Sequence, residues 1–253
     1  MVDLKALAHR LDGAAVRAEL TPQPDGSLSL QQAYEVQRTV VGARIARGAR
    51  QVGIKMGFTS HAKMAQMGLS DMIWGRLTSD MIIADDATVD LARFIHPRVE
   101  PEVAYRLKTP LCGRVSLQEA LAAVDAVAPA LEIIDSRYRD FKFSLAAVVA
   151  DNASSAGFVT GPWHRPEVDV SNLPLTLSFD GVPVQVGSTA EILGHPLNAL
   201  VAAARFAEEA GEPLQPGWII MAGGATAAEP LHAGVRVALE MQTLGCVGFD
   251  VGG

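Results

Sequence analysis

Three glutamates stand among residues that a buried β-strand would choose. The stretch RVEPEVAY (98–105) carries Glu100 and Glu102, and APALEIIDSRY (128–138) places Glu132 between apolar neighbours. Because side chains alternate along a strand, Glu100 and Glu102 point to the same face, with Cα atoms about 6.5 to 7 Å apart. Two like charges at that spacing repel each other unless the face is solvated or a cation lies between them.

Two interpretations of the glutamates stay open on spacing alone. In the first, one divalent ion binds Glu100, Glu102 and Glu132, because a buried carboxylate needs a cation or several hydrogen-bond donors. Ligation by oxygen alone favours Mg²⁺ or Mn²⁺ over zinc, and three protein ligands leave positions of an octahedral ion open for a substrate. In the second, Glu100 and Glu102 lie on a solvated face and Glu132 pairs with Arg137 or a lysine.

A lysine stands in a similar apolar context. GIKMGFTS (53–60) carries Lys55 in a strand-like run between glycines, which let backbone or ligand approach closely. Such a lysine is either a surface residue whose ammonium reaches water or a buried ammonium with a function.

Two further stretches hold polar groups that could bind a substrate. VVADNASSAGFVTG (148–161) clusters hydroxyl and amide groups before a strand; these build an Asx-turn or hydrogen-bond a substrate carboxylate. MAGGATAAEPL (221–231) follows a strand, and its glycines form a tight turn or cradle an anion with backbone N–H groups. Its spacing matches neither a Walker A loop nor a Rossmann fingerprint, which disfavours nucleotide binding.

The elements that must position these groups are mostly short strands. Residues 4–20 and 29–48 show the apolar period of amphipathic helices. After residue 50 the sequence changes to short apolar runs broken by Gly, Pro and Asp. Strands are predicted at 51–58, 99–107, 128–135, 155–160, 174–180, 217–221, 235–241 and 245–250, with helices at 117–126 and 196–210. FDGVP (179–183) predicts a β-hairpin. We therefore expect an α+β fold, with a helical segment at 1–50 and a mixed, coiled β-rich core at 51–253.

Composition narrows the class of protein. The chain has 253 residues, 49% of them hydrophobic, with a formal net charge of −7 and a pI near 5.4. Without a basic stripe, nucleic acid is excluded as a partner. No apolar run approaches the ~18 residues of a membrane span, the start lacks the apolar run of a signal peptide, and two distant cysteines suit a reducing compartment. The composition predicts a cytoplasmic protein that does not associate with membranes.

The chain resembles the fumarylacetoacetate hydrolase superfamily, in its hydratase/decarboxylase branch. The resemblance rests on the order along the chain of GIKMGFTS, the glutamate stretches, VVADNASSAGFVTG and MAGGATAAEPL. The resemblance runs from about residue 30 to residue 250, and LGHPLN (193–198) is also shared by the branch. It implies the β-roll fold of that family and a homo-oligomer. It further implies that Glu100, Glu102 and Glu132 bind Mg²⁺ (or Mn²⁺).

The resemblance also implies roles for other residues. Lys55 matches the active-site lysine, and Asp80 is the best match for a loop aspartate near the site. Arg137 and Lys142 are candidates to orient a distal carboxylate, with structural ion pairing as the alternative. The implied substrate-binding residues are Ser154, Ser155, Gly224 and Thr226.

Within the branch, two reactions of the meta-cleavage pathway for aromatic compounds are candidates. KMGFTSHAKMAQMG (55–68), IDSRYRDFKF (134–143) and GGATAAEPL (223–231) resemble members that decarboxylate 2-oxo-3-hexenedioate to 2-hydroxypenta-2,4-dienoate. The alternatives are hydration of 2-hydroxypenta-2,4-dienoate and a non-catalytic member that binds an oxo-acid or acts as a scaffold. A decarboxylase of this branch is expected to take a small 2-oxo dicarboxylic acid and to associate with the pathway hydratase.

Overall fold

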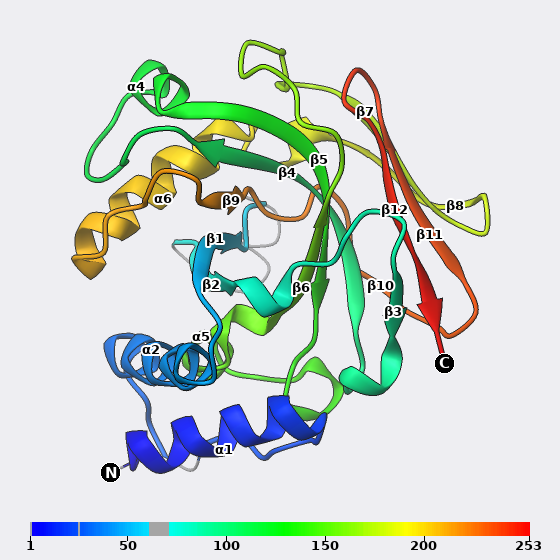
Figure 1. Ribbon diagram of the computed structural model, residues 1–253. Helices are drawn as coiled ribbons and strands as arrows, with labels where there is room; N and C mark the ends of the chain where they lie inside the picture. The colour runs from blue at the N-terminus through cyan, green and yellow to red at the C-terminus, as the bar shows by residue number, and fades with distance from the viewer. Residues whose placement is uncertain (1, 25, 61–70) are drawn as a thin grey trace.

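The protein is a mixed α+β structure, which the computed structural model describes over residues 2–24, 26–60 and 71–253 (Figure 1). Its helices are α1 (Leu4–Arg17), α2 (Leu30–Ala46), α4 (Leu117–Ala122), α5 (Leu145–Ala150) and α6 (Leu197–Ala210). Its strands are β1 (Gln51–Gly57), β2 (Ile73–Thr78), β3 (Thr88–Asp90), β4 (Arg98–Leu107), β5 (Val124–Ile134), β6 (Ser155–Thr160), β7 (Pro174–Phe179), β8 (Val182–Ser188), β9 (Ile219–Met221), β10 (Glu229–Pro230), β11 (Arg236–Met241) and β12 (Gly245–Gly252).

The described strands form two sheets. The larger has the order β2-β1-β9-β4-β5-β6, with β10 also paired to β4. The smaller has the order β3-β12-β11-β7-β8. Most neighbouring strands are antiparallel, but β9 runs parallel to β1 and antiparallel to β4, so it joins these two strands. The long strands β4 and β5 bend strongly, and the large sheet curls around β1 and β9 (Figure 1).

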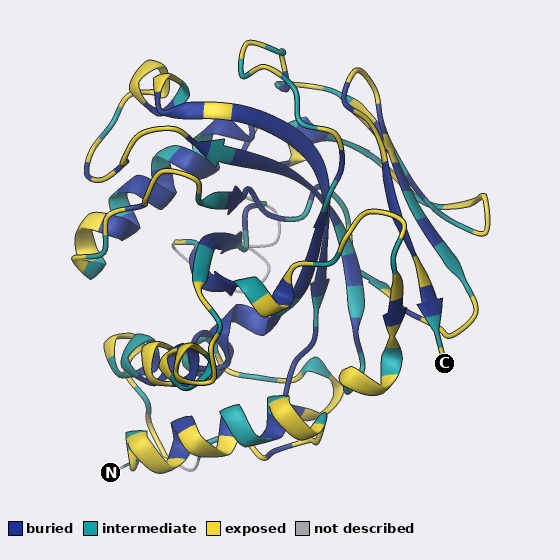
Figure 2. Ribbon diagram, viewed as in Figure 1, coloured by how far each residue is buried: buried dark blue, intermediate teal, exposed yellow. Residues whose placement is uncertain are grey.

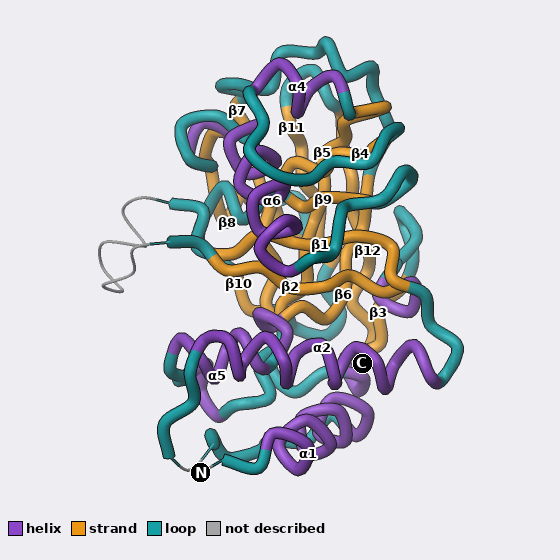
Figure 3. The backbone as a smooth tube through the Cα atoms, turned by 90° about the vertical axis from the view of Figure 1, so that its left-hand side faces the viewer, coloured by secondary structure: helices purple, strands orange, loops and turns teal. Residues whose placement is uncertain are grey.

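The main core lies between the two sheets and under α6. Apolar residues of α6 join a buried cluster with side chains of β1, β4, β5, β9 and β11, and Figure 3 shows α6 across the strands. The central strands are buried along most of their length, while the outer faces of α1 and α2 are exposed (Figure 2). A second cluster joins α1, α2 and α5.

The two N-terminal helices have clear local signals. Asp3 caps α1, and Ser29 with Gln32 forms a capping box at the start of α2. Arg47 forms two hydrogen bonds to Asp12, of 2.6 and 2.7 Å, which tie the helices together. Both helices are shorter than predicted, because the chain turns into a left-handed conformation at Ala18 and leaves α2 after Ala46.

The elements after residue 50 agree with the prediction in kind, with corrections. The predicted hairpin is confirmed: Asp180 and Gly181, with φ of 50° and 77°, connect β7 and β8. The helix predicted at 117–126 ends at Ala122, and β5 begins at Val124, before the predicted start at residue 128. β2, β3, β10 and α5 were not predicted; α5 is too short to show a helical period. Among the described residues, no helix is long and apolar enough to cross a membrane.

Candidate active site and metal centre

The pairing of β4 with β5 brings the three glutamates together. Glu100 lies directly opposite Glu132 in the antiparallel register, and Glu102 lies two residues along the same face. One carboxylate oxygen of each lies within 4.8 Å of the others. The structure therefore gathers on one surface the three residues that the sequence leaves in two separate strands.

Two of these carboxylates are completely buried. Glu102 and Glu132 are 0% exposed, and Glu100 is partly buried. The Gly223 N–H donates to Glu102 Oε2 at 2.7 Å, and Lys55 Nζ donates to Glu132 Oε2 at 2.9 Å. The two Oε1 atoms, of Glu102 and of Glu132, are buried without a hydrogen-bond partner among the described residues. The interpretation that Glu132 pairs with a lysine is thus correct. The solvated strand face that it assumed is wrong for Glu102, which is buried.

The electrostatics of the cluster favour a bound cation. Burial raises the pKa of Glu102 well above its ordinary value, and the charge of Glu132 adds to the effect. Burial also raises the pKa of Glu132, against the opposing effect of Lys55. Three carboxylates share one ammonium, and a divalent ion would supply the missing positive charge to the two free Oε1 atoms. A donor set made only of carboxylate oxygens fits Mg²⁺ or Mn²⁺.

Lys55 is a buried ammonium. It lies in β1, opposite Gly75 of β2, and is 4% exposed. Burial acts to lower the pKa of Lys55, but the charges of Glu132, Glu100 and Glu102 outweigh it and raise the pKa above its ordinary value. The side chain is therefore charged, and its proton-bearing nitrogen faces the carboxylate cluster.

The two glycines after β9 leave space for the cluster. Gly223 has a φ of 100°, and a Cβ there would lie 2.0 Å from Thr59 Oγ1. A Cβ on Gly224 would lie 2.9 Å from Glu100 Oε2. Side chains at either position would displace Glu100 or Thr59, so the loop is a close-packed wall of the site. Its Gly223 N–H is directed at Glu102.

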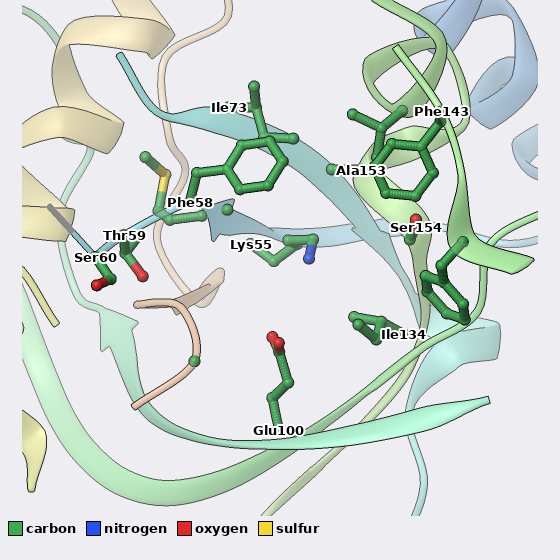
Figure 4. Close-up of a pocket in the computed structure, with 15 residues that line it drawn as sticks. Lys55, Phe58, Thr59, Ser60, Ile73, Glu100, Ile134, Phe143, Ala153 and Ser154 are labelled. Carbon is green, nitrogen blue, oxygen red and sulfur yellow. The ribbon is translucent and has the colours of Figure 1, made fainter. Parts of the chain in front are cut away.

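A cavity of about 140 Å³ opens onto this cluster (Figure 4). Lys55 and Glu100 lie at its centre, with Thr59 and Ser60 on one side and Ala153 and Ser154 on the other. Much of the remaining lining is apolar: Met56, Phe58, Ile73, Ile134, Phe141, Phe143 and Val148. The cavity thus combines a charged centre with a largely apolar wall, which suits a small acid with a hydrocarbon chain.

The turn before β6 supplies one hydroxyl to this cavity. Ser154 Oγ is buried and has no hydrogen-bond partner among the described residues. Ser155 is also buried, but its Oγ lies 3.8 Å from Met81 Sδ, and it is not among the residues that line the cavity. Asn152, Ala153 and Ser154 all have positive φ, at 51°, 52° and 60°. For residues other than glycine this conformation costs about 1 kcal/mol or more each, so the surrounding structure must impose it.

The other predicted site residues lie elsewhere. Thr226 lines a neighbouring cavity of about 250 Å³, which shares Gly224 with the first. Arg137 forms a buried ion pair with Asp151 and lines a separate cavity of about 240 Å³. Asp80 lines that same cavity, 3.4 Å from Arg44 Nε. Their roles in substrate binding and catalysis stay predictions.

Lys142 is exposed, while Phe141 and Phe143 on either side of it line the candidate active site. The backbone carbonyl of Lys142 accepts a 3.0 Å hydrogen bond from Gln23 Nε2. Its predicted role also stays a prediction. Of the run at 55–68, residues 61–68 lie outside the described part of the chain.

Sequence reasoning missed several residues of the cavity. Ile134 follows Glu132 by two positions on β5, so the alternation of a strand could have placed it in the site. Ile73 and Val148 carry no such signal, because nothing in an apolar side chain distinguishes a cavity wall from the core.

Comparison with known proteins supports the resemblance to the fumarylacetoacetate hydrolase superfamily. The family described as "Fumarylacetoacetate (FAA) hydrolase C-terminal" matches residues 50–252. A 4-oxalocrotonate decarboxylase from Pseudomonas sp. is 58% identical over 252 residues, 99% of this chain and 98% of that protein. A 2-keto-4-pentenoate hydratase from Paraburkholderia xenovorans (strain LB400) is 39% identical over 78% of this chain and 74% of its own.

One solved structure is close to this one over nearly its whole length. It is the 4-oxalocrotonate decarboxylase from Pseudomonas putida G7, complexed with magnesium and adipate, with a TM-score of 0.94 and 38% identity. The match covers 98% of this chain and 97% of that one, so the fold expected from the resemblance is confirmed. With its three-carboxylate centre, buried lysine and glycine loop, the chain belongs to the fumarylacetoacetate hydrolase family.

Proposed function

We propose that the protein is a metal-dependent 4-oxalocrotonate decarboxylase. It converts 2-oxo-3-hexenedioate to 2-hydroxypenta-2,4-dienoate and carbon dioxide in the meta-cleavage degradation of aromatic compounds. The observation that carries this proposal is the 58% identity to a 4-oxalocrotonate decarboxylase across 99% of the chain. The glutamate cluster, the buried lysine and the cavity suit the chemistry that the reaction needs.

Glu100, Glu102 and Glu132 would hold the divalent ion, which we propose is Mg²⁺. When bound there, the ion supplies Lewis-acid stabilisation of the negative charge that develops on the substrate's 2-oxygen. In support, the relative from Pseudomonas putida G7 was crystallised with magnesium and, in a second structure, with calcium.

The reaction breaks the bond between the distal carboxylate and the conjugated chain. Its electron pair moves through the double bonds to the 2-oxygen, carbon dioxide leaves, and a proton completes the 2-hydroxy product. Lys55 is close to the carboxylate cluster and carries a proton at Nζ, so it can donate a hydrogen bond to that oxygen or supply the proton. At 4 Å and an effective dielectric of 20, one charge pair contributes about 4 kcal/mol.

The remaining lining of the cavity orients the substrate. Ser154 Oγ is available to donate a hydrogen bond to a carboxylate. Phe58, Phe141 and Phe143 shield the hydrocarbon chain from water. Because a tight grip on the departing carboxylate would stabilise the ground state, an apolar wall suits a group that must leave uncharged.

The second candidate function is hydration of 2-hydroxypenta-2,4-dienoate, favoured by the 39% identity to a 2-keto-4-pentenoate hydratase. It uses the same metal centre but needs a positioned water and an acid/base group near C5. The two reactions are separated by incubating the purified protein with each substrate, with Mg²⁺ and with a chelator. Mg²⁺-dependent carbon dioxide release from the hexenedioate supports the decarboxylase, whereas hydration of the dienoate without carbon dioxide release contradicts it.

A stable ligand tests the site without turnover. Adipate is a saturated six-carbon dicarboxylate that lacks the 2-oxo group, and it is bound in the Pseudomonas putida G7 relative. Calorimetric titration with adipate should show Mg²⁺-dependent binding. A protein that binds adipate but turns over neither substrate would be the non-catalytic member of the family.

The finer expectations about the whole protein are also proposals. They are a cytoplasmic homo-oligomer, an association with the hydratase that consumes the product, and a division into a helical segment at 1–50 and a catalytic domain at 51–253. Size-exclusion chromatography with light scattering measures the homo-oligomer for the protein alone, and the complex when a hydratase is added.

A further inference from the structure

The turn formed by Asn152, Ala153 and Ser154 needs an external support. All three residues are left-handed, which asparagine tolerates but alanine and serine rarely adopt. Within the turn, the Ser154 N–H donates to the Asp151 carbonyl at 3.0 Å, and the Ser155 N–H donates to the Asn152 carbonyl. These local bonds do not hold three residues in an unfavourable conformation, so neighbouring elements must support the turn. Directly after β5, the Asp135 N–H donates to the Ser154 carbonyl at 2.8 Å and gives part of this support.

The Asn152 side chain provides the other part of this support, because it pairs with β2 as a strand would. Its Oδ1 accepts a hydrogen bond from the Arg76 N–H, and its Nδ2 donates to the Arg76 carbonyl, both at 2.8 Å. Asn152 is 3% exposed, so water does not compete for these bonds. Both the oxygen and the nitrogen of the amide therefore attach the turn to one residue of β2.

Gly75 makes this attachment possible. A Cβ at Gly75 would lie 2.5 Å from the Asn152 carbonyl oxygen and 3.3 Å from Ala153 Cβ. Any other residue there would push the turn away from the strand. Gly75 is also the register partner of Lys55 on β1, so the turn packs against the strand position next to this lysine.

The attachment of the turn to β2 places the Ser154 hydroxyl at the cavity. Ser154 is 4% exposed, lines the cavity that contains Lys55 and Glu100, and its Oγ has no partner among the described residues. In Figure 4 Ser154 and Ala153 form the wall of the cavity on the side away from Thr59. A buried hydroxyl without a partner is expected to be satisfied by the ligand.

We propose that Asn152 is a positioning residue of the active site, and that its two bonds to Arg76 fix the Ser154 hydroxyl for a hydrogen bond to a substrate carboxylate. The proposal rests on the proposed function, because that function supplies the carboxylate. Asn152 does not touch the substrate itself, and it acts only through the conformation of the turn.

A double-mutant cycle separates this role from a purely structural one. Asn152→Gly removes the two bonds yet keeps a residue that adopts positive φ without strain. Asn152→Gly and Ser154→Ala are made singly and together, and kcat/KM for 2-oxo-3-hexenedioate and the Kd for adipate are measured with Mg²⁺. Each single variant is expected to lose about 10- to 100-fold, the factor that corresponds to one hydrogen bond to a charged group. If Asn152 acts through Ser154, it causes less than about a twofold further loss in the Ser154→Ala background.

Gln37 provides the matched control. It is also a fully buried amide: its Nε2 donates to the Trp74 carbonyl of β2 and to the Val149 carbonyl of α5, and its Oε1 accepts from the Arg76 guanidinium. Gln37→Met should lower the midpoint of urea unfolding while kcat/KM of the folded protein is kept. If Asn152→Gly does not fold, Asn152→Asp replaces it, because it keeps the acceptor for the Arg76 N–H and loses the donor.

The outcomes distinguish this proposal from the proposed function. An equal loss from the Asn152 substitution in both backgrounds, or no loss in the wild-type background, overturns the positioning role while leaving the decarboxylase intact. A wild-type protein that binds adipate without turnover fails as a decarboxylase, and the cycle is then decided by the Kd values. A wild-type protein that neither turns over the substrate nor binds adipate refutes both proposals.

Discussion

The ammonium of Lys55 is the one basic group in hydrogen-bonding contact with the glutamate cluster among the described residues. It bonds directly to Glu132 and moderates the repulsion among three carboxylates, of which two are fully buried. A buried charge that loses its partner is strongly destabilising. The residue therefore stabilises the glutamate cluster and also lines the candidate active-site cavity.

We predict that Lys55→Met lowers both stability and activity. Loss of the ion pair should reduce the free energy of unfolding of the metal-free protein by about 3 to 5 kcal/mol. Decarboxylation should fall at least 100-fold, because the group that we propose as the proton donor near the 2-oxygen is gone. Urea unfolding in the presence of a chelator and steady-state kinetics with Mg²⁺ measure the two effects. Lys108→Met, at an exposed lysine, is the control; a metal-free Lys55→Met protein as stable as this control would contradict the prediction.

The sequence predicts some of these residues and hides others for a physical reason. Glu100 and Glu102 are two positions apart on one strand, so their common face follows from alternation alone. That Glu132 joins them depends on the register of β4 with β5, which no local pattern specifies. Thr59 was missed because its position against Gly223 is fixed by packing between segments far apart in the chain.

Among the elements, the end of β5 and the end of α5 are tied together by one ion pair. Arg137 Nε bonds to Asp151 Oδ1, and the Arg137 N–H donates to Asp151 Oδ2 at 3.0 Å. Both side chains are buried. The pair holds the chain directly before the left-handed turn, and this structural task accounts for the conformation of Arg137.

The Asp151 carboxyl gives a pH-dependent prediction. Burial raises its pKa from 3.8 to about 6, although Arg137 opposes the shift. Since the folded state binds this proton more tightly than the unfolded state, its stabilising contribution is complete below pH 4 and is lost as the pH rises through 6. The free energy of unfolding of the wild-type protein minus that of Asp151→Asn should fall by up to about 3 kcal/mol across this window. Urea unfolding of both proteins from pH 4 to pH 7 measures it; a difference that rises with pH would mean that Arg137 outweighs burial.

Elements were predictable where their signals are local. The Asp-Gly hairpin between β7 and β8 needs only its two turn residues. β2 was missed because its sequence, IWGRLT, contains a glycine and an arginine. Arg76 is buried there because Glu212 and Gln37 accept hydrogen bonds from its guanidinium, at 2.7 and 2.6 Å. Such distant partners cannot be seen from the strand itself.

At the scale of the whole molecule, the candidate metal centre connects segments from most of the chain. It draws on β1, β4 and β5 and on the loop after β9. An ion that binds only the folded state stabilises all these connections together.

We predict that Mg²⁺ raises the stability of the wild-type protein and that Glu102→Gln abolishes this response. At an Mg²⁺ concentration of 100 times Kd, the free energy of unfolding should increase by about 2.7 kcal/mol. Glu102→Gln keeps an acceptor for the Gly223 N–H but removes one of three like charges, so its metal-free form should be more stable than the wild type. Urea unfolding with chelator and with Mg²⁺ tests both directions, with Glu240→Gln, at an exposed residue of β11, as the control. A full Mg²⁺ response in Glu102→Gln would remove Glu102 from the metal site.

The place of β9 in the large sheet has a consequence for biosynthesis. Lys55 and all three glutamates have been made once a ribosome passes residue 132, but the strand that joins β1 to β4 ends only at Met221. A nascent chain shorter than this lacks both the connection between the lysine strand and the glutamate strands and the Gly223 N–H that fixes Glu102. Long-range pairings of this kind form late, because the intervening chain must first be closed into a loop. The enzyme's centre is therefore completed near the end of translation, and a chain truncated before residue 221 cannot assemble it.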